Sequence, residues 1–311
     1  MLKTLLAQVK EYKKAAILTP LLVVIEVILE VTIPFLMSLI IDRGINNNDM
    51  DAVIKIGIMM LIASFVSLSA GGLAGKYAAK ASTGFAKNLR KAMYYNIQNF
   101  SFANIDKYST AGLVTRLMTD VTNVQNAYMM IIRSAIRAPL MIIFALVMAF
   151  IMGGKMAWIF LFVVPFLTVG LSVIVYKTMP LFRKVFKKYD NLNNSVQENI
   201  KGMRVVKAFV REDYEQKKFD AAASDVCADF TKAERILALN NPLMQFCLYV
   251  NMTFVLSFGS YTIITSRGMD LDVGQFSALL TYGFMMLASL MMLSMIFVMI
   301  TMAAESGKRI A

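Results

Sequence analysis

Two glutamates stand one helical turn apart inside an apolar stretch near the start of the chain. Glu26 and Glu30 lie in the run 15–41 and are followed by Pro34. Four residues apart, their carboxyl groups share one face of a helix. A charge near the middle of a bilayer costs about 2.5 to 3.5 kcal/mol, so these groups are expected to face protein or water rather than lipid.

Two interpretations of the pair stay open. In the first, the carboxylates line a path across a membrane and favour cationic or proton-linked substrates. In the second, they hydrogen-bond to polar groups on neighbouring helices or are neutral. We hypothesise that the pair contributes to substrate selection. Further candidates for such a path are one amide and several flexible thioether side chains, which suit a cavity of variable shape but also fill gaps in any bundle. These candidates are Asn251, Met285, Met292, Met295 and Met299.

Other kinds of chemistry find little support. The chain has no histidine, and Cys227 and Cys247 are expected on a cytoplasmic limb and in the membrane, so neither a metal site nor a disulfide is expected. No residues resemble a nucleophile with its base. The net charge of +12 suggests nucleic-acid binding, but its distribution has another explanation and we expect no nucleic-acid partner.

The elements that position these residues are expected to be membrane helices. Hydrophobic residues make up 58% of the chain, too many for a soluble domain. A bilayer core of about 30 Å needs roughly 20 helical residues. The sequence therefore predicts an all-α membrane protein with six transmembrane helices. The expected spans are 15–41, 54–75, 136–154, 156–176, 242–266 and 273–304.

Basic residues predict the orientation. Lys and Arg gather before the first span, between Lys76 and Arg137 and between Lys177 and Arg235, whereas each remaining loop holds one. This is the positive-inside pattern, so both termini and both long segments are expected in the cytoplasm. The expected location is the plasma membrane, with lipid as a partner and a bacterial source.

The two long cytoplasmic segments, 76–135 and 177–241, share one design. In each, apolar residues recur at three- and four-residue spacing, stop at a cluster of turn-forming or acidic residues, and then resume. We predict two helical hairpins, with reversals near 103–110 and 209–215. At 1.5 Å of rise per residue, a thirty-residue limb would reach about 45 Å into water. Levers of that length favour a machine driven from the cytoplasm over a gradient-driven carrier or channel.

Motifs in these hairpins resemble those of ATP-binding cassette (ABC) exporters. In the first hairpin, Phe102, Gly112-Leu113, Arg116-Leu117 and Asp120-Val121 are similar to the first intracellular loop of that family. The second hairpin is the more specific match, and Ser306 to Ile310 resembles the junction that leads to a nucleotide-binding domain. The residues of the second match are Glu198, Gly202, Val206-Lys207-Ala208-Phe209, Glu212, Glu215 and Phe219.

The resemblance covers essentially the whole chain and implies an exporter transmembrane domain of the multidrug or lipid-exporter type. It implies a shared cavity with a second transmembrane half, identical or different, and an amphiphilic drug-like molecule or lipid as substrate. It also implies that the reversals are coupling helices docking on nucleotide-binding domains, with Phe209 and Tyr214 as anchors or packed within their own hairpin. The implied coupling residues are Asn104, Ile105, Asp106, Lys107, Tyr108, Phe209, Arg211, Glu212, Asp213 and Tyr214.

The ATP-hydrolysing half of that family has no counterpart in these residues. No G-x-x-x-x-G-K-[ST] motif occurs, and Gly154-Lys155 and Gly307-Lys308 lack the upstream glycine. We expect no cofactor on this chain, and ATP with Mg²⁺ on a nucleotide-binding domain. That domain would be either part of a longer polypeptide, which we favour, or a separate chain.

Two shorter patterns have simpler interpretations. Gly71 and Gly75 form a small-xxx-small spacing that permits close helix packing. Arg116 and Asp120 stand four apart on a predicted helix, where an ion pair is worth a few tenths of a kcal/mol.

Overall fold

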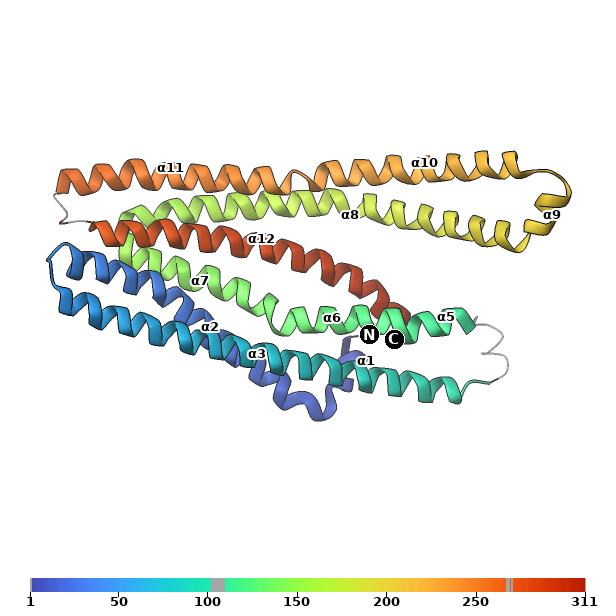
Figure 1. The fold of residues 1–311 in the computed structure, drawn as a ribbon, viewed down its shortest axis with the longest axis horizontal. Coiled ribbons are helices and arrows are strands. Elements are labelled where there is room, and N and C mark those ends of the chain that lie inside the picture. The colour runs from blue at the N-terminus through green and yellow to red at the C-terminus, as the bar shows by residue number, and fades with distance from the viewer. Residues whose placement is uncertain (1, 102–109, 267–268, 270, 311) are drawn as a thin grey trace. The chain divides into compact units, whose positions relative to one another are not determined.

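The chain folds almost entirely into helices, as predicted. The computed structural model describes residues 2–101, 110–266, 269 and 271–310, and every regular element in them is helical. The elements in chain order are α1 (Leu2–Leu6), η1 (Ala7–Tyr12), α2 (Lys13–Leu39), η2 (Ile40–Ile45), α3 (Met50–Gln98), α5 (Thr110–Thr115), η3 (Arg116–Asp120), α6 (Val121–Ile132), α7 (Ser134–Gly153), η4 (Gly154–Ala157), α8 (Trp158–Lys201), α9 (Met203–Ala208), α10 (Glu212–Leu237), α11 (Asn240–Ser266) and α12 (Val273–Ile310) (Figure 1).

Five helical stretches of the described chain are long and apolar enough to cross a membrane. The third contains both α7 and α8, joined at η4, so each of the six predicted spans falls within one of these stretches. The stretches are Thr4–Ile45, Met50–Gln98, Gly112–Lys201, Glu212–Ser266 and Val273–Ile310.

Two helices are much longer than a bilayer requires. Helix α3 has 49 residues and is about 74 Å long at 1.5 Å per residue. It begins where the Asp49 carboxylate accepts a hydrogen bond from the Ala52 amide, an N-cap that satisfies a backbone donor. Helix α8 has 44 residues and continues past Tyr176, where the apolar run ends, without interruption. Both helices therefore extend from an apolar part into a polar part.

The helices form two units, Met1–Pro165 with Cys247–Ala311, and Phe166–Phe246. In the first, α2 packs along α3, and α7 packs against α12 (Figure 1). Its main core takes Val23, Val27 and Val31 from one face of α2, all almost fully buried. The Tyr282 hydroxyl on α12 donates a hydrogen bond to the Val31 carbonyl at 2.9 Å, which ties these two helices together.

A second core in the same unit anchors the N-terminal segment. Leu5 and Val9 are buried with Phe85 of α3 and Tyr128 of α6, whose rings stack with centroids 4.7 Å apart. Gly84 allows this packing, because a Cβ there would overlap the ring of Tyr12. The start of the chain is thus fixed against the polar half of α3.

The second unit is a helical hairpin. Phe182 of α8 contacts Phe230 of α10 edge to face, and Lys188 of α8 lies 3.2 Å from Asp225 and 2.8 Å from Asp229 of α10. The chain reverses direction between these helices, as predicted for this region.

The predicted short helix at 209–215 is displaced. The separate short helix is α9, which ends at Ala208, and α10 already begins at Glu212. Three acidic side chains in the first turn of α10 explain this start, since negative charge stabilises the N-terminal end of a helix. The turn itself includes Val210, whose φ of 51° is rare for a β-branched residue.

Candidate functional site

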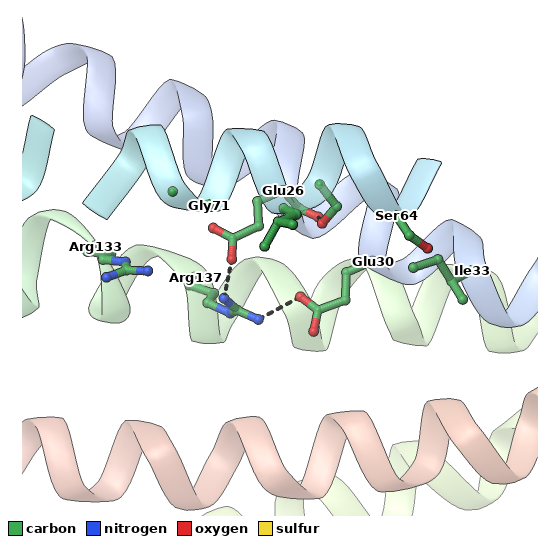
Figure 2. A pocket seen from close by; sticks show the side chains of 10 residues that line it. Glu26, Glu30, Ile33, Ser64, Gly71, Arg133 and Arg137 are labelled. Carbon is green, nitrogen blue, oxygen red and sulfur yellow. Dashed lines mark hydrogen bonds and ion pairs between the residues drawn. The ribbon is translucent and has the colours of Figure 1, made fainter. Parts of the chain in front are cut away.

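The two glutamates predicted from the sequence meet a single arginine. Glu26 and Glu30 project from one face of α2 towards Arg137 of α7 (Figure 2). Arg137 Nη1 lies 2.5 Å from Glu26 Oε1, and Nη2 lies 2.6 Å from Glu30 Oε2. The planar guanidinium therefore bridges both carboxylates, an arrangement that the point charge of a lysine would not reproduce.

The bridge is largely removed from solvent. The side chain of Glu26 is 11% exposed, that of Arg137 26% and that of Glu30 33%. Glu26 Oε2 is buried without a hydrogen-bond partner in the structure. Pairing with Arg137 makes the burial of these carboxylates tolerable, because an isolated buried charge would be far more costly. The structure therefore favours the second interpretation of the pair, bonding to a polar group on a neighbouring helix.

Small residues on α3 make room for this charge. A Cβ at Gly71 would lie 2.9 Å from Glu26 Oε1, and one at Gly75 would lie 3.3 Å from Arg133 Nη1. The Ser67 hydroxyl donates to the Glu26 carbonyl at 3.5 Å. The two glycines, predicted to serve helix packing, thus accommodate charged side chains from neighbouring helices.

A cavity of about 460 Å³ opens beside the bridge. Charged, hydroxyl and apolar side chains from α2, α3 and α7 line it, together with Arg133 at the junction of α6 and α7 (Figure 2). The Arg133 side chain has no hydrogen bond or ion pair with the described residues. The lining residues are Glu26, Glu30, Ile33, Ser64, Ser67, Leu68, Gly71, Gly72, Arg133 and Arg137.

Asn251 lies elsewhere. It is 1% exposed on α11, and neither amide atom has a hydrogen-bond partner in the structure. A Cβ at Gly283 would overlap its amide nitrogen and would lie 2.9 Å from the ring of Phe160. Asn251 is therefore packed between helices and does not line the charged cavity.

The candidate methionines are not part of that cavity either. Met285 is half-buried, whereas three others form an exposed face of α12 at spacings of three and four residues. These are Met292, Met295 and Met299, with 39%, 61% and 45% of their surface exposed. Whether this face meets a substrate stays a prediction.

The predicted coupling residues of the second hairpin surround its turn. Phe209 is 73% exposed and Tyr214 60% exposed. Lys207 and Glu212 form an ion pair of 3.0 Å across the turn. Arg211 immediately precedes Glu212 in the sequence, and Asp213 immediately follows it. Backbone hydrogen bonding, followed by the nearby lysine, lowers the pKa of Glu212. In the first hairpin, the predicted coupling residues Asn104 to Tyr108 lie outside the described residues.

Sequence reasoning missed Arg133 and Arg137 as members of the site. The positive-inside pattern accounts for both as residues that set orientation, which gives no reason to place them in a site. The available signal was an arginine inside the apolar run that begins at Ile136, opposite two acids in another apolar run. Among the described residues, no group of three or more His, Cys, Asp or Glu side chains could hold a metal ion.

Comparison with known proteins connects this architecture to one family. A family model described as the ABC transporter transmembrane region matches residues 16–291. The chain is 31% identical over 305 residues to the uncharacterized ABC transporter ATP-binding protein YfiB of Bacillus subtilis, covering 98% of this chain and 53% of that protein.

More distant relatives match over comparable parts of the chain. An uncharacterized ABC transporter ATP-binding protein of Mycobacterium tuberculosis is 26% identical over 100% of this chain and 53% of its own length. An ATP-dependent lipid A-core flippase of Pseudomonas fluorescens is 28% identical over 72% of this chain and 36% of its own length. The chain thus spans about half the length of the first two of these relatives, or less of the third.

Proposed function

This chain belongs to the ABC transporter transmembrane region family, and from that membership we propose that it is the membrane-spanning half of an ATP-driven exporter. It is a multi-pass membrane protein. In this proposal it forms a substrate pathway with a second transmembrane half, identical or different, and both termini face the cytoplasm. The observation that carries the proposal is the family match over residues 16–291 in a chain whose helices extend far beyond a bilayer.

Coupling to a nucleotide-binding domain is assigned to the tip of the second hairpin. Phe209 and Val210 are 73% and 81% exposed there, and Tyr214 lies one turn into α10. Exposed aromatic side chains on a short turn suit insertion into a groove of a partner domain. Closure of two such domains would then move α8 and α10 as rigid levers.

ATP and Mg²⁺ belong to that partner domain in this proposal. The printed sequence contains no Walker A motif, and the described residues provide no cluster of metal ligands.

An amphiphilic molecule or a lipid is the proposed class of substrate. The charged cavity lies among apolar helices, so a ligand there would meet charge and hydrocarbon within one site. The adaptable methionine face of α12 supports the same class.

Gradient-driven transport is the alternative. It would use Glu26 and Glu30 as proton or cation sites, yet one oxygen of each carboxylate already binds Arg137. The long cytoplasmic helices also have no role in such a carrier.

Transport by the chain together with its nucleotide-binding domain tests the proposal. We expect proteoliposomes to accumulate a fluorescent amphiphile only with ATP and Mg²⁺, and to stop when vanadate is added. Uptake that is independent of ATP but is abolished by a protonophore would instead establish the gradient-driven alternative.

A further inference from the structure

The two arginines that line the cavity differ in their ion pairs. The Arg137 guanidinium pairs with two carboxylates, while the Arg133 side chain lines the same cavity without a hydrogen bond or ion pair among the described residues. The two glutamates alone predict a cationic ligand. The structure indicates an anionic ligand instead, because the group without an oppositely charged partner among the described residues is the Arg133 guanidinium.

The two arginines are suitably placed to act together. They stand four residues apart across the junction between α6 and α7, so their side chains lie about one helical turn from each other. Guanidinium groups bind phosphate and carboxylate through paired N–H donors. Figure 2 shows Arg133 next to Arg137, whose guanidinium is joined to Glu26 and Glu30.

The rest of the cavity lining combines apolar and hydroxyl side chains, as a site for an amphiphile requires. Ile33 of α2 and Leu68 of α3 provide apolar surface, and Ser64 and Ser67 provide hydroxyl groups. A volume of about 460 Å³ lies within the usual range for small-molecule pockets, about 300 to 1,000 Å³. Glu26 Oε2 is buried without a hydrogen-bond partner among the described residues, so the site has one acceptor that a donor on a ligand would satisfy.

We propose that this cavity binds the anionic head group of an amphiphile, a phosphate or carboxylate held by Arg133 and Arg137, with its apolar chain against Ile33 and Leu68. The proposal rests on the proposed exporter function for its meaning in transport. The binding itself does not depend on ATP. In the proposed orientation, Arg133 precedes the third span at the cytoplasmic side, the depth at which anionic lipid head groups attract basic side chains.

Binding to the purified chain in neutral detergent tests the site. Native mass spectrometry would compare dioctanoyl phosphatidic acid with dioctanoyl phosphatidylcholine, a matched dialkyl trimethylammonium amphiphile and inorganic phosphate. We expect phosphatidic acid to bind most tightly. Arg133→Gln should weaken its binding about tenfold, the value of one charge-assisted contact, and Arg133→Lys should weaken it less.

The controls separate this site from general attraction to a basic protein. Lys80→Gln removes an exposed basic residue of α3 that does not line the cavity and should leave binding unchanged. Because Arg133 has no ion-pair partner among the described residues, its replacement strands no opposite charge, and an unchanged circular dichroism spectrum should accompany the loss.

Three outcomes would overturn the proposal. They are equal phosphatidic acid binding by Arg133→Gln and the unaltered chain, tighter binding of the cationic amphiphile, and binding of inorganic phosphate as tight as that of phosphatidic acid. The third would mean a free-anion site rather than an amphiphile site. ATP-dependent transport that persists despite any of these results would leave the exporter function standing and reject only the head-group site.

Discussion

Asp120 and Arg309 form a two-point ion pair between residues 189 positions apart. Arg309 Nε lies 3.0 Å from Asp120 Oδ2, and Nη2 lies 2.6 Å from Oδ1. Asp120 is almost fully buried at the end of η3, and Arg309 lies in the last turn of α12. Asn123 adds a hydrogen bond to Ser306 at 3.2 Å. The C-terminal end of α12 is therefore attached to the first hairpin.

Loss of this attachment should cost stability. In Arg309→Gln, the buried Asp120 carboxylate loses its charged partner, and we expect a destabilisation of about 1 to 2 kcal/mol. This is less than the 3 to 5 kcal/mol for a fully buried pair, because the Arg309 side chain is 53% exposed. Thermal unfolding in detergent measures the effect. Lys308→Gln, which removes an exposed ion pair with Glu305, is the matched control and should change little. Equal losses in both variants would contradict the assignment.

The ion pairs of Arg137 should contribute more to stability than the ion pair between Asp120 and Arg309. Arg137→Gln leaves Glu26 buried without a cation, so we expect a loss of about 2 to 4 kcal/mol in thermal unfolding. Adding Glu26→Gln and Glu30→Gln to that variant removes the stranded charges and should restore much of the stability. If the triple variant were no more stable than Arg137→Gln alone, repulsion and desolvation of the carboxylates would not be the cause.

Removing one acid should strengthen anion binding. Glu30→Gln frees one side of the Arg137 guanidinium and makes the cavity more positive, so phosphatidic acid should bind several-fold more tightly. Transport assays of Glu26→Gln/Glu30→Gln address the earlier hypothesis that the pair selects substrates. Unchanged transport of every substrate in that double variant would reject it.

The turn at Val210 should be strained. Its φ of 51° lies in the left-handed region, which costs about 1 to 2 kcal/mol for an ordinary L-residue and less for asparagine. Val210→Asn should therefore stabilise the hairpin tip by about 1 kcal/mol, measured as slower hydrogen exchange of α9 and the first turn of α10. Val205→Asn, the same exchange at a 60% exposed position within α9, is the control and should be near neutral because valine and asparagine have similar helix propensities. Faster exchange in Val210→Asn would count against strain at this turn.

The contact between α8 and α10 should depend on pH. A hydrogen bond from Lys188 lowers the pKa of Asp229, and hydrogen bonds to Asp229 and Asp225 raise the pKa of Lys188. The Asp229 contribution is present above the usual aspartate pKa near 4 and is lost as the pH falls through its lowered value. The Lys188 contribution is present below the usual lysine pKa near 10.4 and is lost as the pH rises through its raised value.

Hydrogen exchange of this hairpin, corrected for the intrinsic pH dependence, checks both signs. Protection should be constant near neutral pH and decline as the medium becomes strongly acidic. Asp229→Asn should remove most of the acid decline, whereas Lys187→Gln at the neighbouring position should not. An acid decline that survives in Asp229→Asn would assign it to other carboxylates.

Much of the fold could be predicted because its signals are local. Apolar runs of bilayer length, helical spacing of apolar residues and the asymmetry of Lys and Arg all act within a single helix or loop. They were sufficient for the all-α membrane class and for helices that continue beyond the bilayer, such as α8. The hairpin turn was predicted near residue 209, but the short helix was displaced, since its start depends on how a few acidic and aromatic residues divide between two adjacent turns.

The sequence by itself determined that Glu26 and Glu30 share one helical face and need a polar partner, because side-chain direction follows from the 3.6-residue repeat. Only the tertiary structure decided that the partner is Arg137, more than 100 positions away, and that Gly71 makes room for the carboxylate. It also decided that the Arg133 side chain has no ion-pair partner in the part of the chain that the structure describes. The repeat sets the face of each helix, but which faces meet, and at what height, depends on how whole helices pack together. The two acids alone suggested a cation site. Because the helices pack so that both acids pair with Arg137, the charge that stays unpaired among the described residues of the cavity is the positive charge of Arg133.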